Sequence, residues 1–301
     1  MSINNIVSVI IPTLASLERE KFLFRAISSV LLQREVKTIP IVIANGNSFN
    51  PDILEKLDKR KDLRFYYLEE ASQPKAIQVG RSLVETPFFS ILDDDDILFP
   101  YAMITRLQPM QEKDDTDVVV TSGIIHNNNN ITININDFEE ISKDPLGNID
   151  KKWMLTGASL FRTATISSAF FEGMPQYLEW TYMAVRIILG GKKISFLNIP
   201  TVIHFTDHPF SIDISKNAIL GRPQAFKRIL ELELPAEVRH TFETYLGLSY
   251  HAVSQVYLKE RRFKLAWDSH RKMLRCRSGW KNLFFMSGIF RKVKMLLRNY
   301  T

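Results

Sequence analysis

The sequence predicts an α/β fold in which a mostly parallel sheet is flanked by helices. Strand-like and helix-like segments alternate over the first hundred residues, and the strand-like segments are short, apolar and rich in β-branched residues. Strands of this composition are buried on both faces, which is typical of parallel sheets with right-handed crossovers. After residue 100 the alternation is less regular, so we expect a mixed extension of the sheet there.

The first hundred residues contain signals for four strands and three helices. A proline stops the first strand, and an Asn-Gly turn follows the second. Asn50 and Pro51 are typical of a helix start, because asparagine caps the first turn and proline fits its first position. We expect strands at 6–13, 39–46, 63–69 and 87–93, and helices at 22–33, 50–60 and 75–85.

The second half contains further strand signals and then a long helical region. Two strands joined by an asparagine-rich turn are expected within 117–138, and other strands within 153–166 and 192–205. A helix is expected at 177–191, ending at glycine. We therefore divide the chain into a sheet domain, with halves at 1–100 and 101–214, and a basic helical extension at 215–301.

The composition is that of an ordinary globular protein, with 301 residues of which 45% are hydrophobic and 24% are charged. Cys276 is the single cysteine, which excludes an internal disulfide and fits a reducing cytosol. The first residues lack the basic region of a signal peptide, and no apolar run reaches 18 residues. We expect a cytoplasmic protein without a membrane span.

The net charge of +6 conceals a basic C-terminal segment. Residues 259–298 contain 13 Lys and Arg against two acids, so the remainder of the chain carries a net charge of −5. Within the basic segment, residues 280–298 are also rich in aromatic side chains, which is typical of a helix that lies on an anionic membrane surface. A helix that packs its aromatic side chains on the protein is the alternative, and nucleic-acid binding is not expected because no recognition motif accompanies the charge.

Four consecutive aspartates, Asp93 to Asp96, follow the fourth predicted strand. Ligands of open α/β sheets bind at the carboxyl ends of the strands, which is where these side chains lie. Like charges this close repel one another, and a hard divalent cation such as Mg²⁺ or Mn²⁺ would relieve that repulsion. A solvated acidic loop or helix start is the alternative. The position after a buried strand favours the metal site.

Several segments together carry a resemblance to a known family. "VSVIIPT", "AISSVLLQ", "IVIANGNS" and "ILDDDDILFP", in this order, resemble the inverting family 2 glycosyltransferases of the GT-A fold. "YLEWTYMAVRI" and "HFTDHPFS" extend the resemblance to about residues 6–215. It implies a metal-dependent, hexosyltransferase-like enzyme that moves a sugar from a nucleotide-sugar to a glycan or glycolipid acceptor, in bacterial surface polysaccharide assembly at the inner face of the plasma membrane.

The resemblance also implies roles for particular residues. Residues 1–100 would bind the nucleotide and 101–214 the acceptor. Asp95 would bind Mg²⁺ or Mn²⁺ directly, Asp93 and His208 would be further metal ligands, and Asp96 would cap the next helix or support its neighbours. His204 is expected to be structural. The residues expected to bind the nucleotide-sugar are Pro12, Thr13, Asn45, Lys75, Asp93 and Asp94.

Glu179 is the expected catalytic base by the same resemblance. Inverting transfer needs a carboxylate that takes the proton of the acceptor hydroxyl as that oxygen attacks the anomeric carbon. Glu179 is a glutamate where relatives carry an aspartate. An ordinary helix-start acid is the alternative reading, and Glu172 is a lesser candidate for the base.

Two departures from the family pattern bear on the donor. Asn45 stands where relatives have an aspartate that binds uracil, and "NGN" is also an ordinary turn. The family's arginine is missing from 76–80. Lys75, one position earlier, would supply a positive charge to the diphosphate or lie exposed to solvent.

A sugar nucleotidyltransferase is one competing function. Such an enzyme would be expected to have a glycine-rich loop after the first strand, and the loop here has no glycine. An inactive binding module with this fold is the other.

Overall fold

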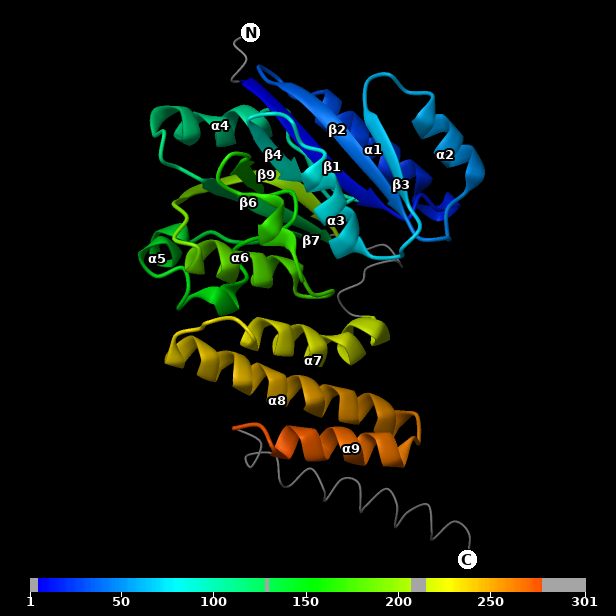
Figure 1. The fold of residues 1–301 in the computed structure, drawn as a ribbon, viewed down its shortest axis with the longest axis vertical. Coiled ribbons are helices and arrows are strands. Elements are labelled where there is room, and N and C mark those ends of the chain that lie inside the picture. Colours follow the sequence, from blue (N-terminus) through cyan, green and yellow to red (C-terminus); the bar gives the residue numbers. More distant parts are fainter. Residues whose placement is uncertain (1–4, 128–129, 207–214, 278–301) are drawn as a thin grey trace, which may run out of the picture. The chain divides into compact units, whose positions relative to one another are not determined.

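The fold is taken from a computed structural model that describes residues 5–127, 130–206 and 215–277. The chain divides into two compact units, Met1–Phe210 and Ser211–Thr301, each described by itself (Figure 1). Within the described residues, nine strands of the first unit form one sheet in the order β3-β2-β1-β4-β8-β6-β9-β5, with β7 paired to β6. The strands are β1 Ile6–Thr13, β2 Lys37–Asn45, β3 Arg64–Leu68, β4 Phe88–Ile91, β5 Ile97–Leu98, β6 Val118–Asn127, β7 Asn130–Ile133, β8 Ser159–Arg162 and β9 Ile194–Phe205.

The first four strands form the parallel part of the sheet. β1 pairs in parallel with both β2 and β4, and β2 pairs in parallel with β3. Alternate β1 residues point to opposite faces, so Val7, Val9 and Ile11 join the core formed with α1 (Glu20–Leu31) and α2 (Pro51–Asp58). Ile10 faces α3 (Gln73–Ser82), where it lies against Gly80. Helices on both faces explain why the central strand is almost wholly apolar.

Local sequence signals account for several of these boundaries. The Asn50 side chain accepts hydrogen bonds from the backbone N–H groups of Asp52 and Ile53, so the predicted helix cap is confirmed. Gly46 follows β2 with φ +79°, and a β-carbon there would lie 2.7 Å from the Cβ atom of Ala71. Only glycine fits this turn, which ends β2 close to the site.

The second half of the unit is mixed, as the sequence predicts. β8 is antiparallel to both β4 and β6, whereas β6 and β9 run parallel, and together they extend the first sheet. The predicted α/β fold is therefore confirmed. Among the described residues, the α-helices of this half are α4 Ala102–Glu112, α5 Phe138–Lys143 and α6 Glu179–Leu189, of which the sequence predicts only α6.

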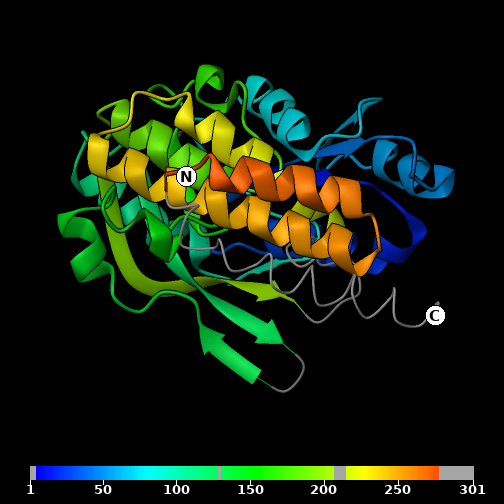
Figure 2. The ribbon, with the colours of Figure 1, turned by 90° about the horizontal axis from the view of Figure 1, so that it is seen from below.

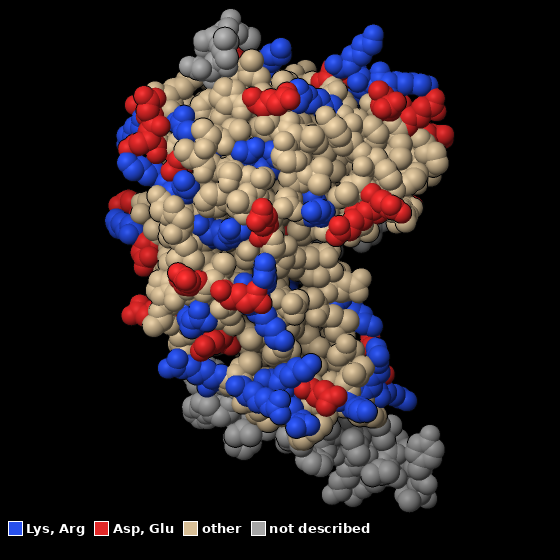
Figure 3. Space-filling view, viewed as in Figure 1, with Lys and Arg blue, Asp and Glu red and all other residues tan. Residues whose placement is uncertain are grey.

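The second unit is helical in its described part. It comprises α7 Lys216–Leu230, α8 Ala236–Lys259 and α9 Phe263–Leu274, and α8 and α9 lie side by side (Figure 2). Lys and Arg side chains gather over α8 and α9 on the face drawn in Figure 3. The basic segment 280–298 lies outside the described residues. Of the helices that are described, none has the length and apolar character needed to cross a membrane.

Candidate active site

The predicted nucleotide-binding residues Thr13 and Asn45 lie side by side at the carboxyl ends of β1 and β2. Parallel pairing opposes Thr13 to Ala44, so the next β2 residue, Asn45, also lies at this edge. The Asn45 Nδ2 atom donates to the backbone oxygen of Thr13 at 2.9 Å, and both residues are buried. Because a carbonyl oxygen only accepts, this bond fixes the amide orientation and leaves Oδ1 as the acceptor of Asn45.

Asp94 is held by two neighbours from the start of the chain. The residue is buried, with 3% of its surface exposed, and its Oδ2 atom accepts from the Thr13 hydroxyl at 2.5 Å. The Arg19 Nε atom lies 3.0 Å from each of its oxygens, and Arg19 Nη2 donates to Oδ1. These bonds occupy the carboxylate in this structure. A contact between Asp94 and the nucleotide therefore stays a prediction.

Arg19 also contacts the next aspartate. Its Nη2 atom lies 3.0 Å from Asp95 Oδ2, so one guanidinium bridges two neighbouring carboxylates. Burial lowers the pKa of Arg19, but the hydrogen bond and charge of Asp94 outweigh it and hold this pKa above its ordinary value. No motif in the sequence indicates a role for Arg19. The one feature of the sequence that could have indicated it is its position, since Arg19 is a cation in the loop after the first strand, near the expected site of the four aspartates.

Asp95 is anchored through its backbone as well. Its carbonyl oxygen accepts from Arg25 Nη2 at 2.7 Å, and the Arg25 guanidinium stacks on Phe205 with 4.1 Å between its carbon and the ring centroid. Arg25 comes from α1 and Phe205 from the end of β9. The turn that carries the aspartates is thus fixed from two elements far apart in the sequence.

Asp93 lies next to the start of α3. Its Oδ1 atom accepts from Gln73 Nε2 at 2.8 Å, at the start of α3. Burial, followed by the negative charges of Asp96 and Asp95, holds the pKa of Asp93 well above its usual range. This is the electrostatic repulsion that the sequence predicts, and a bound cation would relieve it.

Asp96 does not cap a helix, so this part of the prediction is wrong. It precedes β5, and its carboxylate accepts from the Phe205 backbone N–H at 3.2 Å and contacts His204 Nδ1 at 2.7 Å. Burial lowers the pKa of His204, but the charge and hydrogen bond of Asp96 outweigh it and raise this pKa. Asp96 therefore supports β9, which fits the alternative that it supports its neighbours and the structural role expected of His204.

Three of the four aspartates could hold a divalent cation. Asp93, Asp95 and Asp96 each offer one carboxylate oxygen, and these atoms lie within 4.8 Å of one another. Oxygen donors of this kind are those that Mg²⁺ and Mn²⁺ prefer, so the residues fit such an ion. The geometry includes Asp96 beside the predicted ligands Asp93 and Asp95. His208 lies outside the described residues, and its role as a ligand stays a prediction.

Two other predicted donor-binding residues, Pro12 and Lys75, form no hydrogen bond to the aspartates among the described residues. Pro12 is buried within β1, one residue before the edge of the sheet. Lys75 is exposed on α3, and its Nζ atom donates to Gln78 of the same helix at 3.1 Å. It is Gln73, two residues earlier, that reaches the aspartates. A role for Pro12 or Lys75 in donor binding stays a prediction.

The predicted base Glu179 begins α6 and is partly exposed. Its Oε1 atom accepts from the backbone N–H of Tyr177 at 2.9 Å, which fixes the carboxylate at the helix start. Tyr177 has φ +77°, an uncommon conformation for a residue with a side chain. Glu172 is exposed, and its backbone oxygen accepts from Tyr182 and Arg186 of α6. The catalytic role of Glu179 stays a prediction.

A buried arginine forms hydrogen bonds that link one helix to several strands of the sheet. Arg106 of α4 is fully buried and donates to Thr201, Ser90 and the backbone oxygen of Gly157. Burial lowers the pKa of Arg106 to about 9. One side chain thus links α4, β4, β9 and the segment before β8. Arg106 could not be predicted from the sequence, because α4 itself was not predicted.

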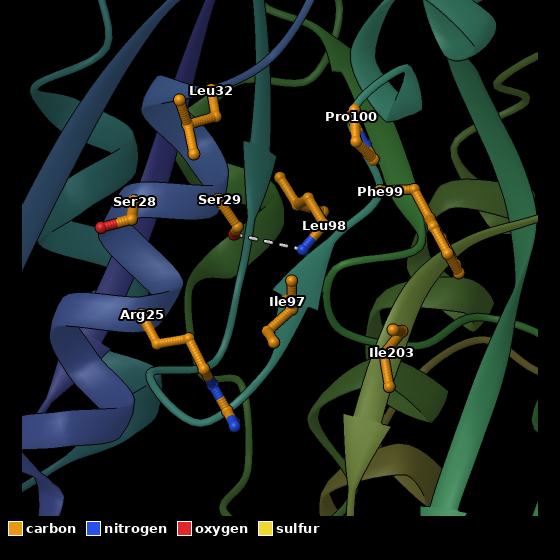
Figure 4. Close-up of a pocket in the computed structure, with 9 residues that line it drawn as sticks. All are labelled: Arg25, Ser28, Ser29, Leu32, Ile97, Leu98, Phe99, Pro100 and Ile203. Atoms are coloured by element: carbon orange, nitrogen blue, oxygen red, sulfur yellow. Dashed lines mark hydrogen bonds between the residues drawn. The ribbon is translucent and has the colours of Figure 1, made fainter.

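A separate hollow of about 400 Å³ lies between α1 and β5, at one side of β9 (Figure 4). Apolar side chains such as Leu32, Ile97 and Ile203 form most of its wall. Its polar Ser29 is already engaged, since the hydroxyl accepts from the Leu98 backbone N–H at 3.2 Å. None of the four aspartates lines this hollow. The carboxylates that could hold a cation lie at the strand ends and not here.

A family model and several solved structures are similar to this chain. The model of the family described as Glycosyl transferase family 2 matches residues 8–172. The crystal structure of S. aureus TarS 1-349 in complex with UDP-GlcNAc superposes with a TM-score of 0.57 at 16% identity, covering 82% of this chain and 72% of that one. A longer S. aureus TarS structure gives a TM-score of 0.53 at 17% identity, covering 80% of this chain and 42% of that one. These likenesses show the fold. No curated protein matches the sequence significantly.

Proposed function

The chain belongs to glycosyl transferase family 2, and from this membership we propose that it transfers a sugar, with inversion, from a nucleotide-sugar to a glycan or glycolipid acceptor. The observation that carries the proposal is the aspartate turn after β4, where three carboxylate oxygens lie within 4.8 Å of one another. The turn lies beside Thr13 and Asn45 at the edge where α/β sheets bind ligands. Assembly of a bacterial surface polysaccharide is the pathway that we propose.

We propose a uridine diphosphate sugar as the donor. Two considerations support this choice. The S. aureus TarS structures contain UDP-GlcNAc in one case and UDP in another. In this chain, the bond from Asn45 Nδ2 to Thr13 leaves the amide oxygen as an acceptor for the N3–H of uracil. Asn45 is uncharged, so we expect it to bind uracil less strongly than an aspartate would.

The proposed mechanism assigns one task to each group. Asp93, Asp95 and Asp96 would hold Mg²⁺ or Mn²⁺, which when bound supplies positive charge to the diphosphate leaving group. Glu179 would take the proton of the acceptor hydroxyl as that oxygen attacks the anomeric carbon from the face opposite the diphosphate. Its fixed position at the start of α6 supports this role.

The two halves of the sheet domain are proposed to bind different substrates. We assign donor binding to 1–100, acceptor binding to 101–214, and a supporting role to the basic extension 215–301. If the acceptor is a lipid-linked glycan, segment 280–298 would bring the enzyme to the inner face of the plasma membrane as a peripheral protein. Exposed Lys and Arg side chains of α9, among them Lys264, Arg271 and Lys272, are compatible with such a contact.

Hydrolysis of a donor panel tests the proposal without knowledge of the acceptor. UDP-, GDP- and dTDP-sugars are incubated with the protein and Mn²⁺, and free nucleoside diphosphate is measured. We expect release from a UDP-sugar, its loss on chelation of the metal, and its loss in Asp95→Ala. Asp62→Ala, which removes an exposed aspartate, should act like the wild type. If no donor binds or reacts and Asp95→Ala changes nothing, the proposed glycosyltransferase function fails.

A further inference from the structure

Arg19 is a cation that contacts two of the four aspartates in this structure, Asp94 and Asp95. Resting on the proposed function, we infer that Arg19 occupies the cluster as a counter-ion when no divalent cation is bound, and binds the donor diphosphate when one is. Arg19 would thus touch the donor itself, a role that no motif in the sequence indicates. It follows from how the guanidinium divides its contacts between Asp94 and Asp95.

The contacts with Asp94 form a firm anchor. Arg19 Nε and Nη2 both donate to this carboxylate, whose remaining bond comes from the Thr13 hydroxyl. The Arg19 side chain has 13% of its surface exposed and the Asp94 side chain 4%. A pair that is this buried and doubly bonded is far stronger than an exposed ion pair. Asp94 therefore keeps Arg19 in place whatever happens at its neighbour.

The contact with Asp95 is the one that a metal ion would replace. Asp95 Oδ2 lies 3.0 Å from Arg19 Nη2, yet Asp95 also belongs to the trio of carboxylates that could hold a cation. A divalent cation on Asp95 would share this small space with a guanidinium of the same sign. Arg19 and the cation thus compete for Asp95, and removing the Arg19 charge should strengthen cation binding.

The same geometry leaves one edge of the guanidinium open for an anion. Among the described residues, no hydrogen bond uses Nη1 of Arg19, since its contacts are made by Nε and Nη2. If the Asp95 carboxylate binds the cation, it no longer accepts the hydrogen bond from Arg19 Nη2, so Nη2 also becomes partly available. Paired guanidinium N–H groups match the oxygens of a phosphate, so this edge suits the diphosphate of a donor held at the cluster.

The test uses the full chain and measures two affinities that should change in opposite directions. Mn²⁺ binding without nucleotide is followed by electron paramagnetic resonance, and UDP binding at saturating Mg²⁺ by calorimetry. Arg19→Gln should bind Mn²⁺ about three- to tenfold more tightly and UDP about tenfold more weakly. Arg19→Lys keeps the charge but loses the fork, so it should leave Mn²⁺ binding near the wild-type value while weakening UDP binding.

Arg60→Gln is the matched control, because Arg60 also forms a two-bond pair with an aspartate, Asp62, and its loss changes the net charge equally. It should change neither affinity. A purely structural role for Arg19 predicts that Arg19→Gln weakens both ligands, and that result, or no change in either, overturns the inference. If the wild type itself binds neither Mn²⁺ nor UDP, the proposed function fails instead.

Discussion

The variant Asp94→Asn removes the charge that Arg19 contacts while keeping the size of the side chain. In the structure, Asp94 accepts from Arg19 and Thr13 and is almost fully buried. We therefore expect this variant to lose stability even when no ligand is present. A carboxylate that only faced the nucleotide would behave differently, because its removal would relieve repulsion among the aspartates and leave the free energy of unfolding unchanged or higher.

The burial of the pair sets the size of the effect. Breaking a buried ion pair by removing one partner costs about 3–5 kcal/mol, whereas an exposed pair is worth about 0–1 kcal/mol. Arg19 keeps its contact with Asp95, and one acid fewer reduces the repulsion within the cluster. We therefore expect Asp94→Asn to lower the free energy of unfolding by about 2–4 kcal/mol. Asp62→Asn, in the more exposed pair with Arg60, should cost less than about 1 kcal/mol.

Urea unfolding without divalent cations measures this difference. Tryptophan fluorescence reports on the first unit when Trp267 and Trp280 are replaced by phenylalanine, which leaves Trp153 and Trp180 as probes. The shift in midpoint of each variant is compared with that of the unchanged background. If Asp94→Asn is no more destabilising than Asp62→Asn, the anchoring role of Asp94 is refuted, and with it the geometry on which the role of Arg19 depends.

Three further predictions concern other parts of the chain. Glu179→Gln should slow donor hydrolysis by about 10²–10⁴-fold with little change in UDP affinity. The control Glu172→Gln should hydrolyse the donor at nearly the wild-type rate. Equal losses of activity in the two variants would contradict the assignment of Glu179 as the base. Burial, and then the charge of His251, lowers the pKa of His270 below its ordinary 6.5, so the unfolded state binds more protons as the pH falls through that value. Stability should therefore drop between pH 7.5 and 5.5, and His270→Gln should lessen the drop in urea midpoint; an equal drop in both proteins would exclude this histidine as the cause. Gly80→Ala would place a β-carbon 2.4 Å from a β1 isoleucine, so it should lower the free energy of unfolding by about 1–3 kcal/mol despite the better helix propensity of alanine. A stabilised Gly80→Ala protein would show that α3 does not pack on β1 this closely.

The parallel half of the fold could be predicted from local patterns. The predicted bounds of β1 match the observed ones because the strand is buried over almost its whole length and mostly apolar, and the start of α2 follows from the Asn50 cap. α4 was missed because Pro109 interrupts it and its apolar residues do not form a clear stripe. α5 is only six residues long, which is too short for a periodic signal.

The site was predictable only where one segment carries the chemistry. The four aspartates are consecutive, so their position at the end of a buried strand could be read directly. Their division of tasks could not, because it depends on tertiary partners. Arg19 meets Asp94 across 75 positions, and His204 meets Asp96 across 108. No local pattern reports such pairs. This is why a helix cap was expected of Asp96, where the structure shows a contact with β9.

A crystal structure with UDP and Mn²⁺ would show whether the aspartate turn holds the cation, because manganese is located by its anomalous scattering. We expect a single strong anomalous peak within coordination distance of Asp95 and Asp93, with the uracil beside Asn45 at the ends of β1 and β2. An anomalous peak away from the aspartate turn, or UDP bound elsewhere on the protein, would contradict this expectation.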